Sequence, residues 1–289
     1  MSKRNLLNLG LFLFIIILLV LVIYEPGKTK PVKPTTLTSL KSNDINSIKI
    51  NRNSASVSEK NIEFKKTDNI WMIVKPHQLT ANTFRIESIL KLLSSVSFSQ
   101  NSLEKLDKSS FGLDRPQVSI TFNGTTKINF GHNKSLKNHR YVEINSTLHM
   151  IPDTFHYQLI AKAESYISHK VLSEKSNIIQ LKLPNMTLDK KEGKWDISPK
   201  QKGFSADSVN QLISEWNLSQ AYDINIANAQ KNSKADIIIK LKNNKVLSFK
   251  LEKTKSSFNL INLNNNIRYI LSKDRQDKLL NLNKINLDN

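Results

Sequence analysis

The sequence contains no cysteine and very little glycine. Without cysteine the chain can form no disulfide, thiolate metal site or cysteine nucleophile, and it carries no lipid-modified cysteine. Only 7 of the 289 residues are glycine, and neither G-x-x-x-x-G-K-[ST] nor G-x-G-x-x-G occurs. The chain therefore lacks the loops with which P-loop and dinucleotide-binding folds hold phosphates. We expect the sequence to reveal location and architecture rather than a chemical activity.

Acidic residues are also scarce, which leaves a surplus of positive charge. The 43 Lys+Arg, of which 36 are Lys, stand against 24 Asp+Glu and give a formal charge of +19. Lysine, asparagine and isoleucine are all abundant, and this is the amino-acid composition expected from an AT-rich genome. A dedicated nucleic-acid surface would concentrate the charge and favour arginine.

The charge is instead spread along the chain. The net charge is +2 for residues 1–24, +2 for 25–40, +7 for 41–171 and +8 for 172–289. We interpret it as a generic basic surface and expect no specific nucleic-acid partner. Binding of an anionic envelope polymer or of nucleic acid through this surface is the alternative.

One long hydrophobic run lies near the N-terminus. Leu6–Tyr24 contains 19 residues and no charge, and as a helix it would be about 28 Å long, close to the hydrocarbon thickness of a bilayer. We predict that residues 1–24 form a cytoplasmic tip and a transmembrane signal anchor. A cleaved signal peptide is the competing interpretation, but no small-x-small cleavage pattern follows the run. The predicted anchor side chains include Leu6, Phe12, Ile16, Leu19 and Tyr24.

The flanks of this run predict its orientation. Lys3 and Arg4 favour an N-terminus in the cytoplasm, although further lysines lie just past the other end. A short tail before a large domain usually places that domain outside the cytoplasm. We predict a single-pass protein of the bacterial inner membrane with a periplasmic C-terminal domain. Residues 25–40 contain three prolines and predict a semi-extended spacer.

The rest of the chain shows an internal repeat, with halves at 41–171 and 172–289. Trp71 and Pro76 in the first half match Trp195 and Pro199 in the second. An amphipathic helix follows in each half, opened by the predicted N-caps Asn82 and Ser205. Its apolar positions, spaced i, i+3, i+4, i+7, are Ile86, Ile89, Leu90 and Leu93, then Val209, Leu212, Ile213 and Trp216.

Both halves then continue with predicted hairpins and a final helix. The predicted strand pairs are Val118–Phe122 with Ile128–Phe130, Tyr141–Asn145 with Leu148–Ile151, Ile237–Leu241 with Val246–Phe249, and Phe258–Leu263 with Ile267–Leu271. The predicted final helices are Thr154–Ile167 and Lys273–Leu282. Period-2 strands and amphipathic helices predict the α+β class, with two antiparallel-sheet-plus-helix lobes. The lobes could pack as separate sheets or join edge to edge.

The sequence contains no recognisable catalytic motif. Five of its six histidines fall in one stretch, at His132, His139, His149, His156 and His169. Metal sites favour two or three converging histidines, but neither H-E-x-x-H nor H-x-H occurs, and no G-x-S-x-G elbow is present. We predict no catalytic residue, no cofactor and no metal ligand, so the protein is not expected to be an enzyme. A metal-dependent envelope enzyme is a second alternative.

The segment Trp71–Ile167 resembles a bacterial family known as domain of unknown function 4340. The features that carry the resemblance are Trp71 with Pro76, the Thr80–Asn82 helix start, the turn Phe111-Gly112-Leu113-Asp114-Arg115-Pro116, Gly131, and Arg140-Tyr141-Val142. The second half has no Gly-Leu-x-x-Pro before Ile237. A binding turn formed by Phe111, Gly112, Leu113 and Pro116 would therefore be confined to the first half.

The resemblance implies an envelope role. Family members look like single-span envelope proteins, often encoded beside ABC-type exporters of the gliding-motility kind, and no catalytic residues are carried over from them. We therefore predict a membrane-anchored extracytoplasmic binding or scaffolding protein. ABC-transporter subunits or other envelope proteins are its predicted partners.

Overall fold

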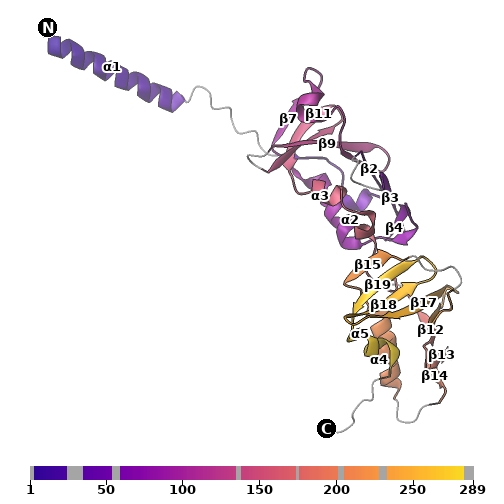
Figure 1. Cartoon of the computed structure of the whole chain (residues 1–289). Coiled ribbons are helices and arrows are strands. Elements are labelled where there is room, and N and C mark those ends of the chain that lie inside the picture. Colours follow the sequence, from indigo (N-terminus) through magenta and orange to yellow (C-terminus); the bar gives the residue numbers. More distant parts are fainter. Residues whose placement is uncertain are drawn as a thin grey trace.

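The computed structural model describes residues 3–24, 35–53, 59–134, 138–173, 176–200, 205–227 and 233–282. The spacer prolines Pro26, Pro31 and Pro34 and the C-terminal residues 283–289 lie outside these ranges. The described residues form an N-terminal apolar helix and a strand-rich body with three sheets (Figure 1). The predicted α+β class is confirmed at this level.

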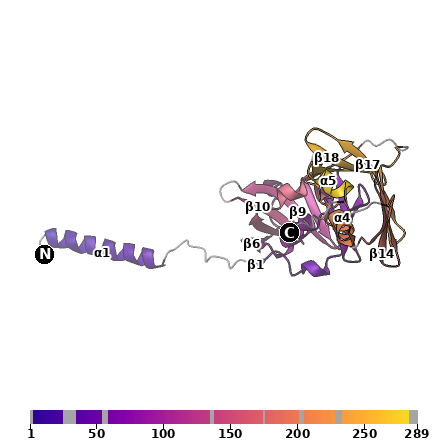
Figure 2. The ribbon, with the colours of Figure 1, turned by 90° about the horizontal axis from the view of Figure 1, so that it is seen from below.

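Helix α1 spans Lys3–Tyr24 and has no buried residue. An 18-residue window of this helix has a mean hydropathy of 3.2, and its 22 residues give a length of about 33 Å, enough to cross a membrane. The helix stands apart from the body in both views (Figures 1 and 2). All five predicted anchor side chains are exposed on it: Leu6, Phe12, Ile16, Leu19 and Tyr24.

The first sheet contains nine antiparallel strands among the described residues. They are β2 Ser47–Arg52, β3 Asn61–Thr67, β4 Ile70–Lys75, β5 Leu79–Thr80, β7 Ser99–Ser102, β8 Val118–Phe122, β9 Thr126–Lys134, β10 His139–Ile144 and β11 Thr147–Pro152. Their order is β5-β4-β3-β2-β8-β9-β10-β11-β7. The β8–β9 and β10–β11 hairpins confirm the two predicted pairs. Positive φ at Asn123 and Gly124 explains the first turn.

The second sheet contains eight antiparallel strands within the described ranges. They are β12 Ile178–Lys182, β13 Thr187–Lys191, β14 Lys194–Ser198, β15 Asp223–Ile226, β16 Ile237–Leu241, β17 Val246–Lys253, β18 Ser257–Asn262 and β19 Ile267–Ser272. Their order is β14-β13-β12-β16-β17-β18-β19-β15. The β16–β17 and β18–β19 pairs confirm the predicted hairpins.

A small third sheet of two strands belongs to the first half of the body. Strand β1, Thr35–Thr36, pairs with β6, Val96–Ser97. Leu37 is buried, and the Thr38 hydroxyl donates to the Leu93 carbonyl at 2.9 Å. The end of the predicted spacer therefore lies along the folded body.

Short helices complete the body. They are α2 Thr83–Leu90, α3 His156–Leu159, α4 Ala206–Leu218 and α5 Arg275–Leu280, with 3-10 turns η1 Ser42–Asp44, η2 Lys91–Ser94, η3 Lys108–Phe111 and η5 Ala163–Tyr166. Both predicted N-caps are confirmed: Asn82 accepts from the Arg85 N–H at 3.3 Å, and Ser205 accepts from the Ser208 N–H at 3.2 Å. Helix α5 confirms the last predicted helix in shortened form.

The predicted single helix Thr154–Ile167 is wrong, because the chain forms α3 and η5 with a break between them. The Arg52 guanidinium donates to the Ala161 carbonyl at 2.5 Å. The Tyr166 hydroxyl donates to the Gln158 carbonyl. The Arg52 side chain thus takes the place of a backbone N–H donor at the Ala161 carbonyl, and Lys162 adopts an extended ψ of 147°.

The buried apolar side chains of the two large sheets form one contiguous core. Trp216 on α4 is fully buried, and its ring N–H donates to the Leu279 carbonyl at 2.9 Å, which ties α4 to α5. The segment after η5 links the sheets, since Ile167 bridges to Ala81 and Lys170 to Gln220. Because the sheets remain separate, the edge-to-edge alternative is wrong for the described residues.

Candidate functional site

The predicted binding turn follows η3 and sits on the outer face of the first sheet. Asp107 opens η3 by accepting from the Ser109 N–H at 3.0 Å. The Ser109 hydroxyl also donates to Asp107, and this hydrogen bond, together with the one from the backbone, lowers the pKa of the exposed Asp107 carboxyl. Gly112 ends η3 with a φ of +67°, a left-handed conformation that favours glycine. The Phe-Gly-Leu sequence is thus a helix end that sends the chain toward β8.

The turn is held by a small apolar cluster separate from the main core. Leu103, Leu113 and Leu148 are buried together, and Phe111 and Tyr141 pack against them. The Phe111 and Tyr141 rings meet edge to face, with their centres 5.0 Å apart. The side chains of Phe111 and Leu113 therefore serve mainly to fix the turn.

Two glycines allow the turn to approach β9 closely. A Cβ atom added to Gly131 would lie closer than 3.0 Å to the Phe111 carbonyl oxygen and 3.1 Å from the Leu113 side chain. A Cβ atom added to Gly112 would lie 2.6 Å from His132 Nε2. The turn and strand thus touch backbone to backbone, and Gly112, Gly131, Phe111 and Tyr141 form one cluster in space.

An ion pair fixes the start of the turn to the sheet. Lys108 Nζ lies 2.6 Å from Glu143 Oε1, and the Asn129 amide donates to Glu143 Oε2 at 3.0 Å. Burial opposes the charge on Glu143, but these hydrogen bonds, with the charges of Lys108 and Lys127, outweigh it and lower the pKa of the carboxyl. Glu143 is therefore ionised at neutral pH.

A second, buried ion pair supports β9 from the other side. Arg140 Nε donates to Asp153 Oδ1 at 2.6 Å, Nη2 donates to Oδ2 at 3.0 Å, and Nη1 donates to the Gly131 carbonyl at 2.5 Å. His156 is buried beside this pair. Burial is the main cause that lowers the pKa of His156, and the Arg140 charge adds to it while Asp153 opposes it.

Two hollows flank the turn. A polar one of about 480 Å³ is bordered by Gly112, Arg115, His132 and His156. A more apolar one of about 700 Å³ lies along β7, with Phe111 in its lining. Both fall in the size range of ligand sites. Pro116 lies two residues before β8 and lines neither hollow.

The five clustered histidines do not converge. His139 stacks on Phe98 with ring centres 4.3 Å apart, and His149 shares a 3.1 Å hydrogen bond with Ser97. His169 lies 3.2 Å from the Ala221 carbonyl, between the two sheets. Within the described ranges no group of three or more histidines and carboxylates could hold a metal ion. Of the five, His132 and His156 border a common hollow.

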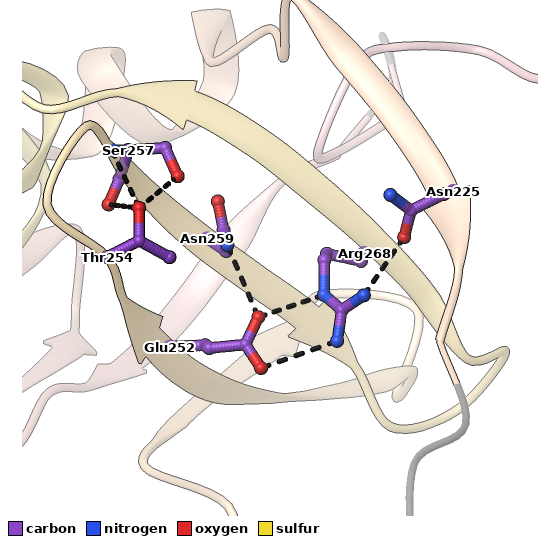
Figure 3. Close-up of polar contacts among 6 residues, drawn as sticks. All are labelled: Asn225, Glu252, Thr254, Ser257, Asn259 and Arg268. Atoms are coloured by element: carbon purple, nitrogen blue, oxygen red, sulfur yellow. Dashed lines mark hydrogen bonds and ion pairs between the residues drawn. The ribbon is translucent and has the colours of Figure 1, made fainter.

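The sequence did not single out a polar cluster on the second sheet (Figure 3). Arg268 Nε lies 2.9 Å from Glu252 Oε2, and the Asn259 amide donates to the same oxygen at 3.2 Å. Arg268 Nη1 also donates to Asn225 Oδ1 at 3.2 Å. The cluster crosses β15, β17, β18 and β19, so it ties four strands together. Its residues are too far apart in sequence for their spacing to reveal it.

Residues 71–262, about two thirds of the chain, match the family described as Domain of unknown function (DUF4340). The match begins at Trp71, where the resemblance in the sequence begins, but it continues through the second sheet to the end of β18. No curated protein and no solved structure matches the chain.

Proposed function

The chain belongs to the DUF4340 family, and from this premise we propose that it is a membrane-anchored extracytoplasmic binding or scaffolding protein. Helix α1 is the anchor, and the two sheets lie in the periplasm. Its partner is a subunit of an ABC-type envelope transport system. The choice of partner rests on the family resemblance of the sequence.

The observation that carries the proposal is the exposure of α1. Every described residue of this helix is exposed, and its apolar side chains lie outside the core of the body. At about 25 cal/mol per Å² such apolar surface is strongly unfavourable in water, so the helix needs a hydrophobic environment. Its length fits a bilayer. The body offers accessible hollows in which a partner or ligand could bind.

Alkaline extraction of membranes tests the anchor. We expect the full-length 33.0 kDa chain to stay in the membrane fraction. A chain shortened by about 24 residues and released as soluble protein would contradict the anchor and support a cleaved signal peptide. A reporter fused after Asn289 tests the compartment, and activity of a reporter that works only in the cytoplasm would refute the periplasmic placement.

Purification in mild detergent tests the partner. We expect transporter subunits to copurify with the full chain and not with an unrelated single-pass protein expressed at the same level. A chimera with a foreign transmembrane helix in place of residues 3–24 shows whether the body alone retains the partner. Recovery of only the lone chain after crosslinking would refute the scaffold role.

We further infer that the body arose by internal duplication. In support, β2, β3 and β4 correspond in order to β12, β13 and β14, and β8 to β11 correspond to β16 to β19. The strands β7 and β15 occupy the same far edge of each sheet. Helix α4 directly follows β14, and α2 follows β4 with only the two-residue strand β5 between them. An experimental structure with different strand orders in the two sheets would contradict this inference.

A further inference from the structure

The polar hollow beside Gly112 has an exposed rim and a buried floor. Asp114, Arg115 and His132 are exposed at the rim, whereas Arg140 and His156 are each 8% exposed at the floor. Its volume of about 480 Å³ is sufficient for a small ligand or for the end group of a larger one. Polar side chains thus converge on this hollow from the turn, from β9 and β10, and from α3.

The buried His156 is the unusual member of this set. Its side chain is 8% exposed, its ring nitrogens form no hydrogen bond with another described residue, and neither nitrogen is fully buried, so the ring stays accessible from the hollow that it borders. Arg140 beside it is fully engaged with Asp153 and the Gly131 carbonyl. A ring nitrogen that faces the hollow and has no protein partner is a free donor, so a bound group could accept a hydrogen bond from His156.

The charges at the rim favour a negatively charged ligand that accepts hydrogen bonds. Arg115 has no ion-pair partner among the described residues, and its guanidinium offers the planar donor fork that suits carboxylates and phosphate-like oxyanions. His132 lies against Gly112 at the same rim. The carboxylate of Asp114 also lines the hollow and would repel an anion. The nearby carboxylate of Asp153 is already paired with Arg140.

We propose that this hollow binds an anionic group, a carboxylate or a tetrahedral oxyanion, held by Arg115 at the rim and His156 at the floor. The site depends only on the geometry of the turn, β9, β10 and α3. It is therefore independent of the transporter partner and of the membrane topology proposed above.

Binding at this site should strengthen in mild acid. The groups that face His156 are Arg140 and Asp153 beside it, Tyr157 in ring contact, and the rim residues Asp114, Arg115 and His132. Burial and the Arg140 charge keep the pKa of His156 below its ordinary 6.5, so at neutral pH the ring is neutral. If the charged ring binds the anion, affinity rises about tenfold for each pH unit of acidification until that pKa is reached.

Histidine-selective NMR on the full chain in detergent tests the proposal. The probes are sulfate and acetate, added against chloride at constant ionic strength, at about pH 7.5 and about pH 5.5, the interval in which histidine titrates. We expect a probe to shift the ring resonances of His132 and His156 but not those of His77 or His149, with tighter binding at the lower pH. Tighter binding of sulfate would indicate a tetrahedral oxyanion as the ligand, and tighter binding of acetate would indicate a carboxylate.

Two variants make the result decisive. Arg115→Gln changes an exposed side chain, so it leaves the fold intact, and we expect it to weaken binding at least tenfold. His156→Phe should abolish the pH dependence, while His149→Phe, a buried histidine outside the hollow, should retain it. The proposal is overturned if neither probe shifts His132 and His156, or if Arg115→Gln binds as tightly as the natural chain.

Discussion

The substitution Gly131→Ala should destabilise the body, although it adds a single methyl group. Gly131 lies in a strand with no left-handed φ, and at such a position alanine would ordinarily stabilise a protein by about 0.4–1 kcal/mol. The new Cβ atom, however, would meet the Phe111 carbonyl oxygen closer than 3.0 Å, where ordinary contact begins at 3.4 Å. The turn must therefore move away from β9 by at least about 0.4 Å.

This displacement would affect the buried groups on both sides of the strand. It would loosen the packing of Leu113 and the hydrogen bond from Arg140 to the Gly131 carbonyl. Overpacking of this kind typically costs about 1–3 kcal/mol. For a body of this size, that corresponds to a fall in melting temperature of roughly 2–12 °C. Scanning calorimetry of the full chain in detergent measures the shift.

Gly112→Ala provides the internal comparison. Its new Cβ atom would contact the exposed ring of His132, which is free to move. The double variant with His132→Ala should therefore relieve the clash and recover most of the lost stability, so that only the left-handed backbone strain remains. No side-chain truncation should rescue Gly131→Ala, because its clash is with a backbone oxygen. If Gly131→Ala melts at or above the natural temperature, the close approach of turn and strand is refuted.

Three further predictions concern buried polar groups. Asp153→Ala would leave the Arg140 guanidinium buried without its partner, and we expect a loss of about 3–5 kcal/mol in chemical denaturation. Trp216→Phe removes the donor to the Leu279 carbonyl and should cost about 1–3 kcal/mol in the same assay. The lowered pKa of Glu143 means that its contribution is present above its ordinary value of 4.5 and is lost as pH falls through the lower folded value. Glu143→Gln should therefore flatten that acid limb of the stability profile, and an unchanged limb would contradict the assignment.

The pattern of apolar residues predicted the elements that carry the core. Hairpins such as β8–β9 have both an alternating face and a turn signal, and their local preferences agree with the fold. Strand β7 was missed because Ser99–Ser102 is polar throughout and lies at an edge, where one neighbouring strand suffices to define it. Strand β15, Asp223–Ile226, is a similar edge strand.

The candidate site shows the same division between local and long-range information. The Phe111–Pro116 turn was recognisable because glycine at a helix end has a local cause. His156 could be seen only as one of several nearby histidines. Its burial depends on Arg140 and Asp153, which reach it through strand pairing rather than through sequence spacing. Convergence of that kind requires the register of the whole sheet.

The scarcity of glycine has a structural counterpart in the abundance of asparagine. In the part of the chain that the structure describes, six asparagines adopt positive φ, at Asn69, Asn123, Asn138, Asn145, Asn244 and Asn266. Asparagine tolerates the left-handed region better than other residues with a side chain, so it can form the tight turns that glycine usually provides. Asparagine thus allows the chain to form its hairpin turns although glycine is scarce. At Gly131, by contrast, a backbone oxygen of Phe111 occupies the space of a Cβ atom, so asparagine could not substitute there.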